Sequence, residues 1–193
     1  MRSQTLSELS FEPNCDDLAS PDFRPYMIET AADYLFVALN HARVNGYIQT
    51  SLSALSLEIM LKSFNAEVST NAGKINETYK PNKRVKDLKG KAHDLVCLYE
   101  LIDPIFQNHL FSNSDIVTLT EHRSVFTSER YGYEREAQGV HTDHLVKLAG
   151  TTLCKIIFLY KNFGCKDQFI THFDINETYF NYVQNVLIFQ PNS

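Results

Sequence analysis

The sequence predicts an all-α protein, an up-down bundle of about five helices in a single domain. Apolar residues recur at spacings of three and four along several separate segments, which is the period of one helix face. The 7 glycines and 6 prolines fall mainly between those segments. With 44% hydrophobic and 21% charged residues, the 193-residue chain has the composition of an ordinary globular protein.

The first two predicted helices form an antiparallel hairpin. Residues 27–43 place apolar side chains at helical spacing, after Pro25 and before the helix breaker Gly46. Residues 47–64 carry a wide apolar face, which is typical of a central helix. We expect the turn between the two helices at Asn45 and Gly46.

Residues 65–92 differ from the segments on either side. They hold seven Lys or Arg residues against three acidic ones and show little periodicity, so they predict a long basic loop inserted after the second helix. Helical spacing returns over residues 93–102. Asp103 and Pro104 then have the residue types of an N-cap and a first helical position, and predict a short helix through residue 111.

Two more helices complete the predicted bundle. Residues 114–131 have a mixed face, half apolar and half charged, whereas the last and longest helix keeps its apolar period to residue 163 and ends at Gly164. The candidate N-caps are Ser114 or Asp115 for the first of these helices and Thr142 or Asp143 for the second.

The predicted domain organisation has three parts. Residues 1–20 form an N-terminal arm, residues 21–164 the bundle, and residues 165–193 a C-terminal appendage packed on it. The appendage is rich in aromatic and β-branched residues with a polar break at Asn176 and Glu177, so either a hairpin or a short helix fits it.

Charge and hydropathy narrow the class of protein. A net charge of −5 argues against a chain that coats nucleic acid over its whole surface, but allows a local basic face. The first residues lack the apolar run of a signal peptide, and the longest apolar stretch, LCKIIFLY, is too short to span a bilayer. We therefore expect a cytoplasmic protein with no membrane segment.

The widely separated cysteines are expected to be free thiols: Cys15, Cys97, Cys154 and Cys165.

Four spaced pieces of the sequence carry a family resemblance. They are SALSLEIMLKS in the second helix, KAHDLVCLY at the third, FTSERYGYE at the end of the following one, and the closing long helix. In this order, over about residues 34–163, the chain resembles the HEPN superfamily of small helical bundles. The resemblance implies an all-α bundle that commonly pairs into homodimers. It also implies one of several roles: RNA cleavage in toxin and defence systems, nucleotide or RNA binding, or an inactive scaffold.

The stretch REAQGVHTDH contains the candidate catalytic residues. In nuclease members of the family, an arginine followed after four to six residues by a histidine stands before the last long helix, and Arg135 and His141 match that pattern. Cleavage of RNA by its own 2′-hydroxyl needs a group that moves protons and a cation that stabilises the charge on phosphorus. His141 would supply the first and Arg135 the second. Glu136 departs from the polar residue that many active members place after the arginine.

The same stretch allows other interpretations. His141, Asp143 and His144 are suitable ligands for zinc or manganese, with His122 or Glu121 as a further ligand. Alternatively, Asp143 only caps the helix and the histidines are exposed. Our prediction includes no metal and no cofactor.

A second group of candidates lies near the basic insert. His93, Lys89 and Lys91 form a cationic approach for a phosphate, although His93 and Asp94 could equally serve only the start of a helix. Three further candidates complete the set: Arg130 as a rival phosphate ligand, Tyr79 as a ring that could stack on a base, and Glu58 with Lys62 as a structural ion pair on one helix.

These observations predict a HEPN-like protein that binds RNA or another phosphate-bearing ligand, with metal-independent endoribonuclease activity as the catalytic form of that hypothesis. The alternative is a catalytically inactive, dimeric helical module that binds a protein partner. Sequence patterns leave open whether the chain is an enzyme. They predict fold more directly than function, because family members share the bundle and differ in activity.

Overall fold

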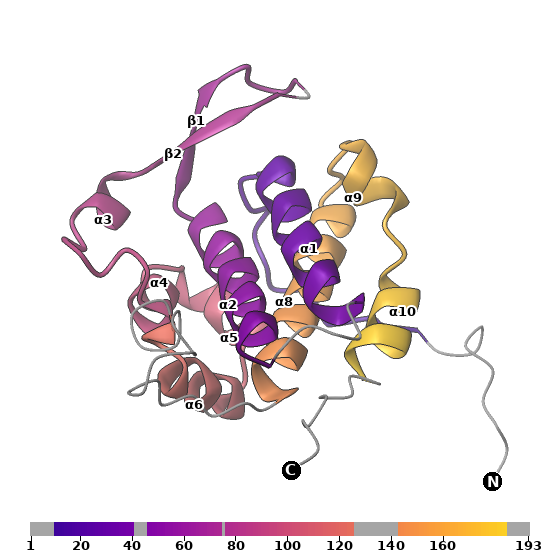
Figure 1. Cartoon of the computed structure of the whole chain (residues 1–193). Coiled ribbons are helices and arrows are strands. Elements are labelled where there is room, and N and C mark those ends of the chain that lie inside the picture. The colour runs from indigo at the N-terminus through magenta and orange to yellow at the C-terminus, as the bar shows by residue number, and fades with distance from the viewer. Residues whose placement is uncertain (1–9, 41–45, 75, 126–142, 185–193) are drawn as a thin grey trace, which may run out of the picture.

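The computed structural model describes residues 10–40, 46–74, 76–125 and 143–184, and this part of the chain is mostly helical with one two-stranded sheet (Figure 1). The all-α class is therefore confirmed. The elements are α1 (Pro25–Asn40), α2 (Gly46–Ser63), β1 (Ala66–Thr70), β2 (Thr78–Pro81), α3 (Lys83–Lys86), α4 (Leu95–Glu100), α5 (Pro104–Leu110), α6 (Asn113–Glu121), α8 (Asp143–Asn162), α9 (Gln168–His172), α10 (Ile175–Glu177) and the π-helical segment η2 (Thr178–Val183).

The core lies between α1, α2 and α8. The α1 and α2 helices pack against each other and both contact α8, whereas α4 and α6 complete the other side of the bundle (Figure 1). The predicted apolar faces point inward: Ile28, Leu35, Leu57 and Leu61 are all buried. Most of one face of α8 is also buried, which agrees with the expectation that the last long helix is packed along its length.

Helix ends follow the predicted chemistry in some places and not in others. Asp103 caps α5 through Ile105 N, with Pro104 in the first turn, as predicted. Gly164 follows α8 with a φ of +77°, the left-handed conformation that favours glycine. The N-cap of α6 is Ser112 instead of the predicted Ser114 or Asp115, because Asp115 is the third residue of a capping box with Ser112.

The structure corrects two predictions, the end of one helix and the structure of the basic insert. The helix expected over residues 114–131 ends at Glu121, and residues 126–131 lie outside the described part of the chain. The basic insert is not a featureless loop, because β1 and β2 form an antiparallel hairpin with Val68 opposite Tyr79, and α3 follows it. A search for helical periodicity overlooks the β-branched and aromatic residues of such short strands.

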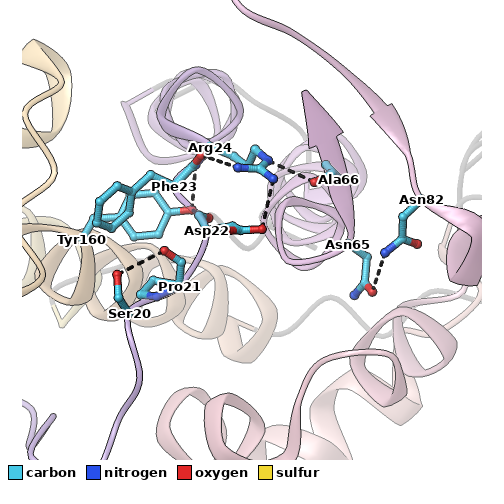
Figure 2. Close-up of polar contacts among 9 residues, drawn as sticks. All are labelled: Ser20, Pro21, Asp22, Phe23, Arg24, Asn65, Ala66, Asn82 and Tyr160. Carbon is cyan, nitrogen blue, oxygen red and sulfur yellow. Dashed lines mark hydrogen bonds and ion pairs between the residues drawn. The ribbon is translucent and has the colours of Figure 1, made fainter. Parts of the chain in front are cut away.

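The base of the hairpin is fastened to the bundle by Arg24 (Figure 2). Arg24 Nε donates to Ala66 O at 3.0 Å, at the start of β1, and Arg24 N donates to the hydroxyl of Tyr160 on α8 at 3.2 Å. Beside this contact, Asn82 Nδ2 donates to Asn65 Oδ1 at 3.2 Å. The N-terminal segment, the last long helix and both ends of the hairpin therefore meet at one polar junction.

The described part of the C-terminal appendage is helical, so the helix alternative is correct there and the hairpin alternative is wrong. The segments α9, α10 and η2 pack along α1 and α8. Phe11 N donates to Asn176 Oδ1 at 2.9 Å and its ring packs on Tyr179, which ties the N-terminal segment to the appendage.

All four cysteines are free thiols. Burial raises the pKa of Cys154, within α8, to about 12, so this side chain behaves as a small hydrophobic residue. None of the described helices is long and apolar enough to cross a membrane.

Candidate functional site

A buried carboxylate on α2 is the centre of the candidate site. Glu58 is 4% exposed, and its Oε1 lies 2.5 Å from Lys62 Nζ and 3.0 Å from His93 Nδ1. The other oxygen, Oε2, is buried with no hydrogen-bond partner among the described residues. The His93 side chain, by contrast, is 65% exposed. One carboxylate therefore connects the core of the bundle to an imidazole at the surface.

The start of α4 holds His93 in place. Asp94 is the N-cap of this helix, and its Oδ1 accepts from Val96 N at 3.0 Å and from Cys97 N at 3.1 Å. Its Oδ2 accepts from Arg123 Nε at 3.1 Å and Nη2 at 2.8 Å. Asp94 was expected to serve the start of a helix, and it does so as the N-cap residue that precedes the first turn of α4.

The charge of Asp94 is stabilised by these contacts. Burial opposes ionisation of the carboxyl group, but the Arg123 guanidinium and the amides of Cys97 and Val96 together outweigh it, so the pKa of Asp94 is lowered. A carboxyl group whose pKa is lower in the folded than in the unfolded protein stabilises the fold above its unfolded pKa. That contribution is lost as the pH falls through the folded value.

We expect Asp94→Ala to lower the free energy of unfolding by about 1–2 kcal/mol at pH 7, the usual effect of losing an N-cap. The difference from wild type should shrink as the pH falls below about 4, where the carboxyl group becomes protonated. Urea unfolding followed by circular dichroism at pH 7 and at pH 3 measures both effects. Asp94→Asn, which keeps the cap acceptor, should recover much of the loss at pH 7, and equal losses for the two variants would contradict the capping role.

The cationic segment, residues 83–91, approaches His93 along α4. It holds five basic residues and one acidic residue, whereas the whole chain has 18 basic and 23 acidic residues. Val85 is buried and anchors the segment, while Lys86, Lys89 and Lys91 are exposed. Arg84 Nη1 donates to Leu101 O at 3.2 Å, just after the end of α4, so the segment extends from one end of α4 to the other.

A tight turn presents the last two lysines of the segment. Lys89 has a φ of +40° and Gly90 a φ of +82°, and Asp94 N donates to Lys91 O at 3.0 Å. The left-handed conformation is unfavourable for lysine, which costs of order 1 kcal/mol that the surrounding structure must offset. Burial raises the pKa of the Cys97 thiol in the first turn of α4, and the positive charge of Lys91 partly opposes that rise.

The remaining predicted residues are less well placed or lie elsewhere. Arg130, Arg135 and His141 are outside the described residues. The structure shows the expected ion pair between Glu58 and Lys62. Its additional partner, His93, was not expected.

The described residues offer little for a metal ion. Asp143 is paired with Lys147, and His144 Nε2 lies 4.0 Å from Asp143 Oδ1. His122 is buried and its Nδ1 lies 3.0 Å from Thr118 O. Across residues 10–40, 46–74, 76–125 and 143–184, no group of three or more metal-ligating side chains comes together.

Tyr79 is poorly suited to stack on a base. The side chain is half-buried on β2, and its hydroxyl is buried with no hydrogen-bond partner among the described residues. Burial, followed by the nearby Glu77 carboxylate, raises the pKa of this hydroxyl. The hydroxyl end therefore belongs to the junction between the hairpin and the bundle. The structure contradicts the idea of a fully exposed aromatic platform among the lysines.

No protein-family model, curated protein or solved structure matches this chain. The fold and site themselves define a mostly helical protein in which a basic surface segment adjoins an exposed imidazole held by a buried carboxylate. This geometry can attract a polyanion, and it can hold one histidine ring in a fixed orientation beside it.

Proposed function

We propose that this chain is a HEPN-like helical protein that binds RNA along the cationic segment and His93. The observation that carries the proposal is the segregation of charge. Residues 83–91 are strongly basic in a chain with a net charge of −5. A local basic strip on an otherwise acidic protein attracts phosphates to one face and repels them from the others.

The shape of the strip favours a polymer over a single small phosphate. The basic residues extend along α4, whose six residues correspond to about 9 Å of helix axis. Successive phosphates of a nucleic acid strand are spaced closely enough for several to contact such a strip together. The segment also lacks the glycine-rich loop, followed by a long helix, that encloses the phosphates of a bound nucleotide.

A binding titration tests this proposal. We expect a fluorescent single-stranded RNA to bind the wild-type protein with an affinity that falls steeply with salt, and about 10-fold more weakly to Lys86→Ala/Lys89→Ala/Lys91→Ala at low ionic strength. The slope of log affinity against log salt should decrease by about 2, since each lost phosphate contact removes about 0.7 for a single strand. Fluorescence anisotropy between 25 and 200 mM salt, roughly, covers the useful range.

A matched control variant tests whether RNA affinity depends on where the lysines lie or only on the net charge of the protein. Lys74→Ala/Lys80→Ala/Lys166→Ala removes the same charge from the hairpin and from the turn after α8, and should bind RNA almost as well as wild type. Equal weakening by both triple variants would mean that net charge alone matters, and would contradict a specific strip. Absence of binding by the wild-type protein would refute the proposal.

The HEPN resemblance supports the proposal through the order of its sequence pieces. The resemblance also makes Arg135 and His141 the predicted cleavage pair. Both residues lie outside the described part of the chain, so this pair stays a hypothesis. Active members pair across a dimer, so a homodimer belongs to the proposal as well.

A second candidate function, binding a protein partner, is favoured by a different surface. Tyr26, Tyr34 and Val37 follow helical spacing along α1 and are 49%, 37% and 46% exposed, with Ile48 of α2 also exposed. An exposed apolar stripe of this kind suits a helix of another protein or of a second copy. The titration described above distinguishes the two functions, because an interaction module has no need to bind RNA.

A further inference from the structure

We propose that the outer side of α1 binds a basic amphipathic helix of a partner protein. The α1 stripe, defined as Tyr26, Tyr34 and Val37, contacts the apolar side chains of that helix, and the carboxylates of Glu29 and Asp33 pair with its Lys or Arg residues. This inference rests on the second candidate function, the binding of a protein partner, and is independent of RNA binding.

The outer side of α1 carries large exposed side chains. The helix contacts α2, α8 and α9, which cover its inner side and its edges (Figure 1). Its buried residues include Ile28 and Leu35, whereas all three residues of the α1 stripe are exposed. Single exposed apolar residues are normal on any protein, but several aligned on one helix mark a surface that another molecule covers.

Two parallel rows of side chains form this outer side. Residues 26, 30 and 34 make one row and residues 29, 33 and 37 the other, because positions four apart lie one above another on a helix. From Tyr26 to Val37 the stripe covers about 16 Å of helix axis, which is about three turns. Rows of this kind are what the side-chain rows of a second helix pack between.

Ile48 extends the stripe onto the next helix. Gln49 Nε2 donates to Ala38 O at 3.1 Å, which brings the start of α2 beside the Val37 end of the stripe. Ile48, just before Gln49, is itself exposed. The apolar surface therefore continues from α1 to the start of α2.

The charge beside the stripe is negative. Glu29 and Asp33 are the only charged residues of α1, and Asp167, the N-cap residue of α9, adds a third carboxylate. Burial, followed by Asp167 and Asp33, raises the pKa of Glu29, so these carboxylates disfavour one another's charge. Within the described part of the chain, neither Glu29 nor Asp33 forms an ion pair.

This charge selects the partner. A helix with Lys or Arg beside its apolar residues is attracted to Glu29 and Asp33, whereas an acidic helix is repelled. A second copy of α1 is also disfavoured, because a symmetric contact brings the carboxylates of the two copies together. The tyrosine rings suit the same partner, since they pack against apolar side chains and attract cations to their faces.

The test uses a pair of fluorescent synthetic peptides of about 18 residues, long enough to form a helix. The basic peptide has Leu at helical spacing and Lys on both flanks, and the acidic peptide has Glu in place of every Lys. We expect the wild-type protein to bind the basic peptide about 10-fold or more tightly than the acidic one at low ionic strength. Fluorescence anisotropy measures both affinities.

Two variants of α1 test the apolar and the charged contacts separately. Tyr34→Ser/Val37→Ser should weaken binding of the basic peptide by about 10-fold or more, as loss of central contact residues does. Asp33→Lys should weaken binding of the basic peptide by about 10-fold and strengthen binding of the acidic one. Thermal unfolding shows whether each variant is folded, and Asp33→Asn replaces Asp33→Lys if the latter is not, with a smaller loss expected.

Matched control variants lie on α5 and α6. Ile105→Ser/Val117→Ser removes two other exposed apolar side chains, and Glu121→Lys makes the same charge reversal at the end of α6. Both should bind the basic peptide within about 2-fold of wild type, because residues outside a contact contribute little to its affinity. Equal weakening by the control and the α1 variants would mean that the peptide binds without regard to position, and would overturn the inference.

The remaining outcomes separate the inference from the function on which it rests. Tighter binding of the acidic peptide, lost in Tyr34→Ser/Val37→Ser, would overturn the basic partner and leave partner binding by α1 standing. Self-association of the protein that the same variant abolishes, measured by sedimentation equilibrium, would make a second copy the occupant and also overturn the inference. If wild type binds neither peptide and does not self-associate, the inference and the second candidate function both fail.

Discussion

Replacing Tyr160 by alanine is expected to lower the free energy of unfolding by about 3–5 kcal/mol, the largest effect of any substitution considered for this fold. Tyr160 lies on α8, is 1% exposed and packs its ring on Phe23 with centroids 5.0 Å apart. Its hydroxyl accepts from Arg24 N at 3.2 Å and lies 3.4 Å from the backbone oxygen of Asp22. Alanine would leave a large cavity and would remove the acceptor of the partly buried Arg24 N–H. Urea unfolding measures the loss.

Tyr160→Phe separates the cavity from the hydrogen bonds. It keeps the ring and should cost only about 1 kcal/mol, so equal losses for phenylalanine and alanine would contradict the role of packing. The same variant tests the ionisation of the hydroxyl, because burial raises the pKa of Tyr160 to about 12. Stability from this group is complete below its unfolded pKa of about 10 and is lost as the pH rises toward 12. The phenylalanine variant should therefore lose less stability between pH 10 and 12 than wild type.

The second large effect is expected at Gly150, where α8 meets η2. A methyl group added at Gly150 would overlap Cγ2 of Val183 and lie 3.3 Å from its Cγ1. Val183 is 2% exposed and its short, branched side chain has little freedom to move away. We expect Gly150→Ala to lower the free energy of unfolding by about 1–3 kcal/mol through overpacking. For a protein of this length the melting temperature should fall by roughly 2–4 °C per kcal/mol.

A double-mutant cycle tests the origin of that effect. Val183→Ala removes the methyl groups that Gly150→Ala would overlap, so the double variant should be more stable than the sum of the two single losses implies. Limited proteolysis should show earlier cleavage between residues 173 and 184 in Gly150→Ala alone. Purely additive losses would mean that the glycine is needed for some reason other than contact with Val183.

Sequence patterns predicted the long helices of this fold because their apolar stripes are read directly from spacing. Residues 27–40 and 47–63 lie in α1 and α2 as predicted, while residues 41–43 are outside the described part of the chain. Gly46, expected in the turn, is instead the first residue of α2, and Gly164 marks the end of α8 as expected. The short elements were less predictable. Ser112 caps α6 because its side chain accepts from Asp115 N while the Asp115 side chain accepts from Ser112 N. These two hydrogen bonds decide which of several neighbouring polar residues is the N-cap, and they are known only from the structure.

The site was predictable only in its parts. His93, Lys89 and Lys91 were candidates because charge and residue type are visible in the sequence. The contact from Glu58 to His93 spans 35 positions and joins two elements, so no local pattern contains it. The pairing of Arg123 with Asp94 is hidden for the same reason.

The junction at Arg24 has a consequence for how this protein can vary. The hairpin is fastened at its base, where Arg24 bonds to Ala66 and Asn65 pairs with Asn82 (Figure 2). Residues 71–74 and Asn76 lie between the end of β1 and the start of β2, and they are exposed. Insertions at that tip raise the entropic cost of closing the loop only slightly, and they leave the contacts at the base unchanged. The tip is therefore a position where related chains can gain or lose residues, or an engineer can insert a peptide, without displacing the basic strip beside His93.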